Sequence, residues 1–380
     1  MTNNPIKIGL KGFGFIGKIH AQAYQSIPFA FSNPEVTAKI NAVMRIRTDR
    51  DQEFIQSLGG PIVTADNDTF YKQDLDLVDI CTPNLLHKEQ ALDALTHKTH
   101  LYVEKPLGMD LDQAREIAKA ARSAGVLTHT AFMMRYFPAI QQVKAIIASG
   151  VLGEIYHFRA QYFHHSYMDP QRPISWRLQQ ASSGGGALAD LGVHMIDMTR
   201  YLMGEAVFVN CRTRTFISQR PETAGSSKLI TVDVDDWALC TIGLISGGQG
   251  IIEVTRLSGG IGDSTRMEVY GTKGSVVFDL NDPLHCEYYD QKSKQHHSGS
   301  LDFPTPENEI IQTNCWPPAK MSLGSFLNAH TASIYHFLQC IRGGKQSPLN
   351  FDDAVKTQEI LEAAYLSAGR NSETIKLPLD

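Results

Sequence analysis

Apolar and polar positions alternate between two patterns in the first third of the chain. Short segments rich in apolar residues occur at residues 6–10, 40–44, 77–81, 101–104 and 126–130, with a weaker one near Ile62. Between these runs, apolar residues recur at helical spacing over residues 18–26, 52–58, 85–95 and 111–124. Buried parallel strands typically form continuous apolar runs, and the helices that cover them are amphipathic. The pattern therefore predicts a doubly wound parallel sheet of the Rossmann type.

Strand-like segments dominate the second half of the chain. They occur at residues 155–162, 207–215, 237–244, 250–256, 266–270 and 275–279. A chain of 380 residues exceeds one ordinary core, so we expect these strands to form a second domain. An extended sheet without covering helices must bury its open face elsewhere, and a second subunit is the natural partner.

A run of three glycines at residues 184–186 precedes an apolar-periodic segment that continues to Leu202, which predicts a helix opened by a glycine loop. Asp190 and His194 are four residues apart and share one face of this helix, where Asp197 joins them. A carboxylate beside an imidazole can serve as a general acid/base pair near neutral pH. Taken alone, the pair fits better a histidine that caps a buried polar contact, and no role is assigned to Asp197.

Composition narrows the class of protein. The net charge of −5 offers no electrostatic basis for binding nucleic acid or an anionic membrane. The six cysteines are scattered without a CxxC spacing, which favours reduced thiols in a cytoplasmic enzyme over a disulfide framework or a zinc site. The first apolar run is too short for a signal peptide, and no run reaches the length of a membrane span.

The first predicted strand leads into a glycine-rich turn and then a helix. Gly12 permits the turn, Gly14 lets the backbone approach a pyrophosphate, and Gly17 lets the helix pack on the strand. Phe15 and Ile16 lie between them, at the helix start, where free amide N–H groups attract phosphate. This strand–turn–helix context predicts a dinucleotide site.

Basic residues follow the second predicted strand, where enzymes that prefer NAD usually carry an acidic residue for the ribose 2′-hydroxyl. Arg45 or Arg47 could instead hold the 2′-phosphate of NADP. The alternative is a surface arginine pair that contacts no ligand. The cofactor expected is therefore NAD(P)(H), with a preference for NADP.

Further motifs follow in a fixed order. They are Cys81-Thr82-Pro83-Asn84 with His87, Glu104-Lys105-Pro106, Arg135-Tyr136-Phe137-Pro138, the glycine-led helix with Asp190 and His194, Gly271-Thr272-Lys273-Gly274-Ser275, and a terminal helix at 353–367. Together with the glycine turn, they make the whole chain resemble the Gfo/Idh/MocA oxidoreductases, which include glucose–fructose oxidoreductase and inositol dehydrogenase. The resemblance implies a Rossmann domain at 1–132 and, at 133–380, an α/β domain for substrate binding with a large, mostly antiparallel open sheet. It also implies a homo-dimer or homo-tetramer formed through that sheet.

The resemblance places Lys105, Asp190 and His194 in the active site. Lys105 would polarise the substrate oxygen, and His194 would exchange a proton with the substrate hydroxyl as hydride moves to or from the nicotinamide. Asp190 would orient His194, or bind an adjacent hydroxyl and hold the lysine. An ordinary ion pair is the alternative for Lys105. Family precedent also implies a cis peptide bond before Pro106.

Residues near the ends of the parallel strands are expected to hold the cofactor. In addition to the glycine turn and Lys105, they are Thr82, Pro83, Asn84, His87 and Glu104. This placement follows from the rule that open parallel sheets bind ligands at the carboxyl ends of their strands. A role in packing the helix is equally open for His87.

Substrate selection is expected to depend on residues that lead into or lie within the second domain. These are Arg135, Tyr162, His164, Trp176 and Arg177. Aromatic rings can stack on a sugar ring while His and Arg reach its hydroxyls. An alternative is that His164, His165, His194 and Asp190 gather a metal ion. Because the family transfers hydride without a metal, we expect none.

The function expected is a dehydrogenase or reductase that acts on a secondary alcohol or ketone of a sugar, cyclitol or derivative. An NAD-dependent glycoside hydrolase that uses transient oxidation is one alternative. A dinucleotide-sensing regulator without turnover is another, but such a protein is expected to lack the lysine or the histidine, and this chain keeps both.

Overall fold

The computed structural model describes residues 4–301, 303 and 313–379, and the chain divides into two compact units. Unit 1 consists of Met1–Gly108, Asp112–Tyr136 and Ile311–Val355, and unit 2 consists of Met109–Leu111, Phe137–Ile310 and Lys356–Asp380. The chain thus leaves unit 1 a few residues after the expected boundary at 132. The segment Ile311–Val355 also belongs to unit 1, whereas the expected division into 1–132 and 133–380 places it in the second domain.

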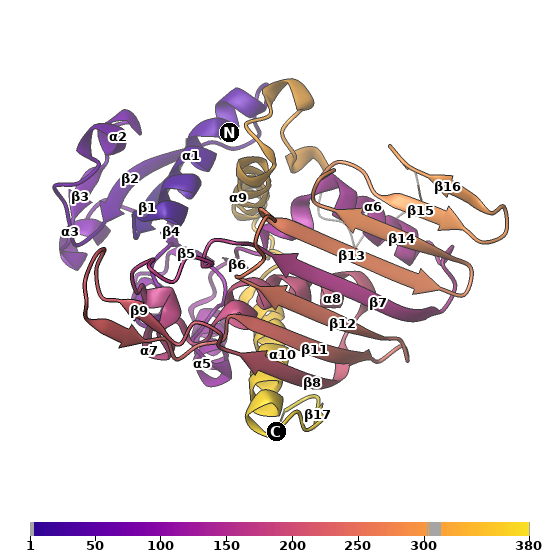
Figure 1. The fold of residues 1–380 in the computed structure, drawn as a ribbon. Helices are drawn as coiled ribbons and strands as arrows, with labels where there is room; N and C mark the ends of the chain where they lie inside the picture. Colours follow the sequence, from indigo (N-terminus) through magenta and orange to yellow (C-terminus); the bar gives the residue numbers. More distant parts are fainter. Residues whose placement is uncertain (1–3, 302, 304–312, 380) are drawn as a thin grey trace. The chain divides into compact units, whose positions relative to one another are not determined.

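Unit 1 is built on a six-stranded sheet in the order β3-β2-β1-β4-β5-β6 (Figure 1). All neighbouring pairs are parallel, which confirms the predicted Rossmann fold. The strands are β1 (Ile6–Lys11), β2 (Ala38–Met44), β3 (Ile62–Thr64), β4 (Leu77–Ile80), β5 (His100–Val103) and β6 (Thr128–Thr130). All four residues of the central β4 are buried: the apolar Leu77, Val78 and Ile80, as the apolar character of this segment predicts, and also Asp79.

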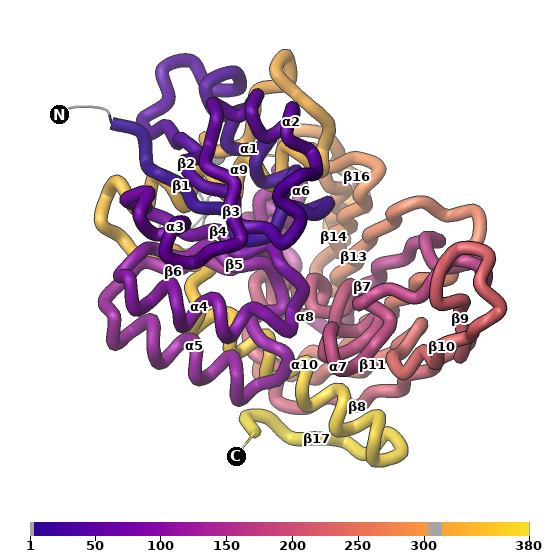
Figure 2. Tube along the Cα trace, turned by 90° about the vertical axis from the view of Figure 1, so that its left-hand side faces the viewer, coloured from indigo at the N-terminus to yellow at the C-terminus, as the bar shows by residue number. Residues whose placement is uncertain are grey.

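Helices cover this sheet. They are α1 (Phe15–Ala30), α2 (Gln52–Ser57), α3 (Asn67–Tyr71), α4 (His87–Thr96), α5 (Leu111–Ala124) and α9 (Ser325–Gly343). Helix α4 packs on β4 and β5, as the side view shows (Figure 2). Helix α9 comes from late in the sequence and packs along α1 (Figure 1). Pro28 lies inside α1, near its C-terminal end.

Unit 2 is built on a nine-stranded sheet in the order β16-β15-β14-β13-β7-β12-β11-β8-β17. Only the pair β7–β12 is parallel, so the expectation of a large, mostly antiparallel sheet is confirmed. The strands are β7 (Ile155–Phe163), β8 (Ala206–Arg214), β11 (Trp237–Leu244), β12 (Gln249–Thr255), β13 (Ser264–Gly271), β14 (Gly274–Asp279), β15 (Glu287–Asp290), β16 (Gln295–His297) and β17 (Ile375–Lys376). Strands β9 (Gln219–Pro221) and β10 (Leu229–Thr231) form a separate hairpin.

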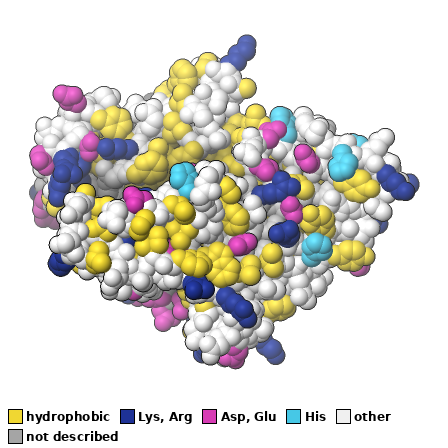
Figure 3. All heavy atoms as spheres, in the orientation of Figure 1, with side chains coloured by type: hydrophobic (Ala, Val, Ile, Leu, Met, Phe, Trp, Pro, Cys, Tyr) yellow, Lys and Arg dark blue, Asp and Glu magenta, His cyan; other side chains and the backbone are white. Residues whose placement is uncertain are grey.

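One face of the large sheet is buried and the other is open. Burial alternates along β11, β12, β13 and β14, so that every second side chain faces the core. On the buried side, α6 (Pro138–Ala148) packs on β14, and α8 (Val193–Met203) packs on β7. Two further helices are the short α7 (Gln180–Ser183) and α10 (Phe351–Gly369). The open face carries basic, acidic and apolar side chains side by side (Figure 3).

No helix in the described part of the chain combines the length and apolar character needed to cross a membrane.

Candidate active site

The glycine turn of unit 1 has the geometry that a pyrophosphate requires. Gly12 adopts a φ of +91°, in the region that favours glycine. A Cβ at Gly17 would lie 2.3 Å from the carbonyl oxygen of Gly12, whereas a Cβ at Gly14 would meet nothing within 4 Å. Helix α1 begins after Gly14 with no side-chain cap on its first amides. Its N–H groups and the open space at Gly14 therefore fit a dinucleotide phosphate.

Arg45 lies directly after β2 and is held by an acidic neighbour. Its Nη1 atom is 3.0 Å from Oδ2 of Asp51 and 2.8 Å from the carbonyl oxygen of Arg50. Asp51 also accepts a hydrogen bond from Lys18 in the first turns of α1, at 2.8 Å. Hydrogen bonds from Lys18 and Arg45 lower the pKa of Asp51. Arg47 is exposed. The first basic residue after β2 is thus connected to the start of α1 through one carboxylate.

His87 connects the two turns that follow β4 and β5. Its ring is fully buried, with Nδ1 2.9 Å from the carbonyl oxygen of Pro106 and Nε2 3.0 Å from that of Thr82. Burial lowers the pKa of His87. Asn84 opens a short 3-10 helix, Asn84–Leu86, before α4. His87 therefore contacts the backbone carbonyls of both turns and can donate a hydrogen bond to one of them, which fits a role in holding their shape.

Glu104 and Lys105 lie at the carboxyl end of β5. Oε1 of Glu104 is 3.2 Å from Nε2 of His20, and Oε2 accepts the amide N–H of Lys105 at 3.2 Å. Burial acts to raise the pKa of Glu104, but His20 outweighs it and lowers the pKa to about 2. Lys105 itself is half-buried. The peptide bond before Pro106 is cis, as the resemblance implied.

Arg135 is buried in unit 1. Its Nη2 atom pairs with Oδ2 of Asp353 at 2.6 Å, and its guanidinium lies 6.0 Å from the ring centre of Phe132. These contacts fit a structural role for Arg135, which joins the segment around Phe132 to Asp353. The expected contact of Arg135 with substrate stays a prediction.

The glycine loop of unit 2 is packed against one buried carboxylate. A Cβ at Gly186 would lie 2.0 Å from the carbonyl oxygen of Asp235, so this approach requires glycine. The side chain of Asp235 accepts the amide N–H groups of Gly186 at 2.9 Å and Leu188 at 2.8 Å. Tyr365 donates its hydroxyl to the same carboxylate at 2.9 Å. Asp235 therefore satisfies the amides at the start of the helix that carries Asp190 and His194.

That helix is not α-helical from its first turn. Leu188–Gly192 is π-helical and leads directly into α8. The expected helix is therefore present, but Asp190 lies in the widened turn and His194 in the first turn of α8. Such π-helical segments are frequent at functional sites.

Asp190 is paired with a buried arginine. Oδ2 of Asp190 lies 3.0 Å from Nη2 of Arg256, which is 1% exposed. Burial acts to lower the pKa of Arg256, but Asp190 raises it. Nη1 of Arg256 also donates to the carbonyl oxygen of Arg177 at 3.2 Å. The structure thus fixes one oxygen of Asp190 and links it to the segment at Arg177.

His194 and its aromatic neighbours lie in unit 2. The ring of His194 is buried, and its centre is 6.2 Å from that of Tyr162, whose pKa burial raises. Burial also lowers the pKa of His164, whose Nδ1 accepts the amide N–H of Ser166 at 3.2 Å. Figure 1 shows β7, which carries Tyr162, next to β12.

Trp176 and Arg177 begin a short 3-10 helix, Trp176–Leu178, and both are half-buried. The Arg177 guanidinium lies 4.3 Å from the centre of the Trp176 ring. A stacked cation and indole pair offers an apolar face beside hydrogen-bond donors. Unit 2 therefore brings Asp190 and Arg177 to one arginine, Arg256, and places Tyr162 beside His194.

The alternative metal site is not supported. Among the described residues, His164, His165, His194 and Asp190 do not provide three ligand atoms within 4.8 Å of one another. Nδ1 of His165 lies instead 2.7 Å from the carbonyl oxygen of Ile261.

Sequence reasoning missed residues that support these groups. They are His20, Asp51, Asp235, Arg256, His330 and Tyr365. A weak signal was available for Asp235, because an acidic run at 233–236 directly precedes an apolar strand. No local pattern marks Arg256 or Tyr365, which act only through three-dimensional contacts.

Comparison with known proteins identifies both halves of the chain. Residues 6–132 match a sequence family described as an oxidoreductase family with an NAD-binding Rossmann fold, GFO_IDH_MocA. Residues 140–277 match the GFO/IDH/MocA C-terminal domain.

Individual relatives are similar over most of their length. Levoglucosan dehydrogenase from Pseudarthrobacter phenanthrenivorans is 30% identical, with 97% of each chain covered. Myo-inositol 2-dehydrogenase from Thermotoga maritima is 28% identical, over 72% of this chain and 75% of that protein. A structure of levoglucosan dehydrogenase in complex with NADH and L-sorbose superposes with a TM-score of 0.88 at 29% identity, covering 99% of both chains.

Proposed function

The chain belongs to the GFO/IDH/MocA oxidoreductase family, and from that premise we propose that it interconverts a secondary alcohol and a ketone on a sugar or cyclitol. A bound nicotinamide dinucleotide supplies the hydride acceptor or donor for this chemistry. The dehydrogenase names of its relatives support this class of reaction, and levoglucosan and myo-inositol are the kinds of substrate they name.

The observation that carries this proposal is the pairing of a phosphate cradle with a lysine at the same sheet. The start of α1 has no side-chain cap and is open at Gly14, and Lys105 is the second residue after β5. Both lie at carboxyl ends of parallel strands, where open α/β sheets bind ligands.

Three side chains of the protein are proposed to act on the substrate. Lys105 donates a hydrogen bond to the reacting oxygen and stabilises negative charge that develops there. His194 accepts the hydroxyl proton during oxidation and returns it during reduction. Asp190, paired with Arg256 through Oδ2, orients His194 or binds a neighbouring substrate hydroxyl.

Substrate recognition is proposed to involve three half-buried residues of unit 2, Tyr162, Trp176 and Arg177, and the buried His164. Tyr162 and Trp176 offer ring faces that suit the apolar face of a pyranose or cyclitol. His164 and Arg177 offer polar atoms for hydroxyl groups. We also propose that the open face of the large sheet pairs with a second copy, giving a dimer or tetramer. Six buried free cysteines fit a reducing compartment such as the cytoplasm.

The test is a panel of sugars, anhydrosugars and cyclitols, with formation of the reduced cofactor followed by absorbance. On the best substrate, Lys105→Met and His194→Gln should each lower kcat by roughly 10²–10⁴-fold while dinucleotide affinity stays within a few-fold. His285→Gln, at a half-exposed histidine paired with Asp282, is the matched control and should retain full activity. Near-normal kcat in either active-site variant would refute the assigned roles. Release of a free sugar without net change in cofactor would instead identify a glycoside hydrolase.

For the cofactor we propose a preference for NADP, with Arg45 and Arg47 binding the 2′-phosphate. Asp51 competes for Arg45, because the two are already paired. Arg45→Ala should therefore weaken NADP binding by about tenfold or more and spare NAD, since charge-assisted hydrogen bonds contribute about 1.5–3 kcal/mol. Asp51→Asn should shift the ratio of affinities further toward NADP. Equal affinity of the unmodified protein for both dinucleotides contradicts the preference.

A further inference from the structure

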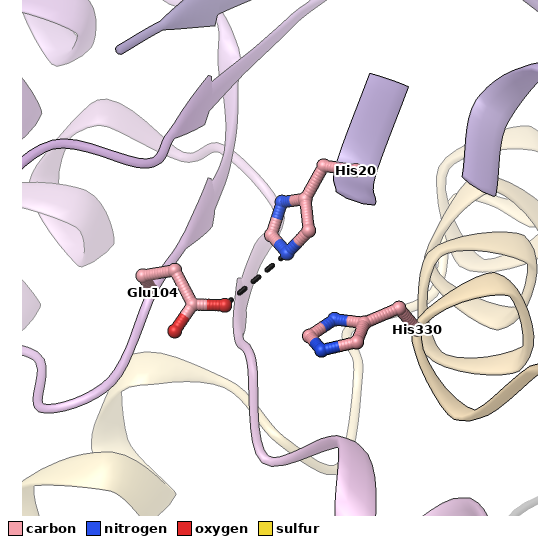
Figure 4. Close-up of side chains that lie close together, drawn as sticks. All are labelled: His20, Glu104 and His330. Atoms are coloured by element: carbon pink, nitrogen blue, oxygen red, sulfur yellow. Dashed lines mark ion pairs between the residues drawn. The ribbon is translucent and has the colours of Figure 1, made fainter. Parts of the chain in front are cut away.

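A buried cluster of metal-ligating side chains lies in unit 1, apart from the proposed roles of Lys105 and the glycine turn. It consists of His20 from α1, Glu104 at the end of β5, and His330 from α9 (Figure 4). One ligand atom from each residue lies within 4.8 Å of the other two. The three are 0%, 8% and 2% exposed, respectively.

The ring of His330 is the first sign that something else belongs in this cluster. Both of its nitrogens are buried, and neither has a hydrogen-bond partner. Leaving a buried polar atom without a partner costs about 1–3 kcal/mol. His330 projects toward His20 and Glu104 (Figure 4). A group placed among the three would therefore relieve a cost that the protein otherwise carries.

The contact between His20 and Glu104 is the second sign. Nε2 of His20 and Oε1 of Glu104 are 3.2 Å apart, yet they lack the geometry of a hydrogen bond. The Nε2 atom of His20 points between Glu104 and His330 (Figure 4). Two ligands of a tetrahedral zinc, each about 2.0–2.1 Å from the ion, lie about 3.3 Å apart. This pair already has that separation, and a ring nitrogen of His330 lies within 4.8 Å of both atoms.

The surroundings of His20 also suit a metal ligand. Its other ring nitrogen, Nδ1, is 3.0 Å from Oδ2 of the fully buried Asp79, and Tyr24 donates its hydroxyl to the same oxygen at 3.0 Å. A carboxylate bonded to one ring nitrogen orients the other toward a metal, and histidine ligands of zinc almost always have such a partner.

The charges of the cluster favour a divalent ion. Two buried carboxylates, Asp79 and Glu104, flank the single ring of His20. A divalent cation placed beside His20 would offset the negative charge of both carboxylates, and buried charge without compensation is costly.

We propose that His20, Glu104 and His330 bind a zinc-type divalent transition metal ion. Two imidazoles and one carboxylate are a ligand set that zinc accepts, with a water completing the coordination. The ion would join α1, β5 and α9, three segments far apart in the sequence, and would fix the carboxylate that bonds the Lys105 amide. Its role is structural, and the proposal does not depend on the identity of the substrate.

The test uses the full-length protein, freed of metal with a chelator and titrated with Co²⁺ as a spectroscopic probe and with Zn²⁺. We expect one ion per chain, visible d–d absorption from Co²⁺, and a higher Tm with Zn²⁺. His330→Phe should abolish the absorption and the rise in Tm. His336→Gln, which changes another buried histidine of α9 outside the cluster, should keep both.

Two results would overturn the proposal. One is the absence of stoichiometric binding to the unmodified protein, which would assign the space to water. The other is equal binding by His330→Phe, which would place the ion elsewhere, as at His285 and Asp282 on the surface. If His330→Phe fails to fold, X-ray absorption of the zinc-loaded unmodified protein decides. A spectrum that shows two imidazoles bound to the zinc supports the site, and any other number of bound imidazoles contradicts it.

Discussion

The hydroxyl of Tyr365 offers a direct test of how the glycine loop of unit 2 is held. The Tyr365 ring is partly exposed, but its hydroxyl donates to buried Asp235 and lies 3.1 Å and 3.2 Å from the amide nitrogens of Gly186 and Ala189, which donate to it. Tyr365→Phe removes this one atom and leaves the ring in place. Gly186 keeps its bond to Asp235, whereas the Ala189 amide loses the hydroxyl to which it donates.

The magnitude follows from the groups left behind. One hydrogen bond to a carboxylate is lost, and one backbone amide loses its acceptor, so the free energy of unfolding should fall by about 2–4 kcal/mol. If the loss is confined to the loop, the Ala189 amide should exchange its hydrogen roughly 30–700-fold faster, since 1.4 kcal/mol corresponds to a factor of ten. Urea denaturation and hydrogen exchange measured by mass spectrometry report the two quantities.

The control is Tyr156→Phe, because Tyr156 is 63% exposed on β7. That variant should leave both measurements unchanged. A loss below about 0.5 kcal/mol in Tyr365→Phe, together with unchanged exchange at residues 186–189, would show that the hydroxyl does not hold the loop.

Two further predictions follow from individual positions. Gly17→Ala should lower both Tm and dinucleotide affinity, because its Cβ would lie 2.3 Å from the Gly12 carbonyl oxygen. Gly14→Ala should keep Tm and lower only the affinity, since its Cβ would fill space that the dinucleotide needs. Thermal melts and fluorescence titration compare the two variants, and equal Tm values would contradict the packing argument. Burial lowers the pKa of His336 to about 4, so as pH falls below about 6.5 the unfolded chain binds a proton that the folded chain excludes, and stability should drop by up to about 3 kcal/mol by pH 4. His336→Gln should show a shallower decline in urea denaturation across that range, and parallel pH profiles would assign the loss to other groups.

The Rossmann half of the fold could be predicted because its strands are buried on both sides. Leu77, Val78 and Ile80 in β4, for example, are all fully buried, so apolar residues occupy three of the four positions of this strand and point to both faces of the sheet. Helix α9 was not predicted. Its apolar stripe, with Ala329, Ile334 and Phe337 buried, shows that one face packs against something. The stripe does not say that the partner is α1, about 300 residues earlier in the chain.

The residues of the candidate site also fall into those that the sequence identified and those that it could not identify. Gly12, Gly17 and Lys105 belong to motifs whose spacing carries their role, and the sequence identified them. Arg256 and His330 could not be found, because each acts through a partner distant in sequence. The π-helical turn at Leu188–Gly192 also left no trace in the apolar periodicity, since it changes the hydrogen-bonding of the backbone and not the order of side chains.

The pair of Asp190 and Arg256 bears on which of the proposed catalytic groups, Asp190 or His194, accepts the proton of the substrate hydroxyl. A guanidinium at 3.0 Å favours the charged form of a carboxylate, and Arg256 is too buried to be displaced by solvent. A carboxylate held in its charged form by an arginine is a weak base for a substrate hydroxyl. The proton of the hydroxyl should therefore pass to the imidazole of His194, while Asp190 provides a fixed negative charge that stabilises the imidazolium formed. On this reasoning Arg256 is a positioning residue. Arg256→Met should shift the pH dependence of kcat, whereas KM should change little.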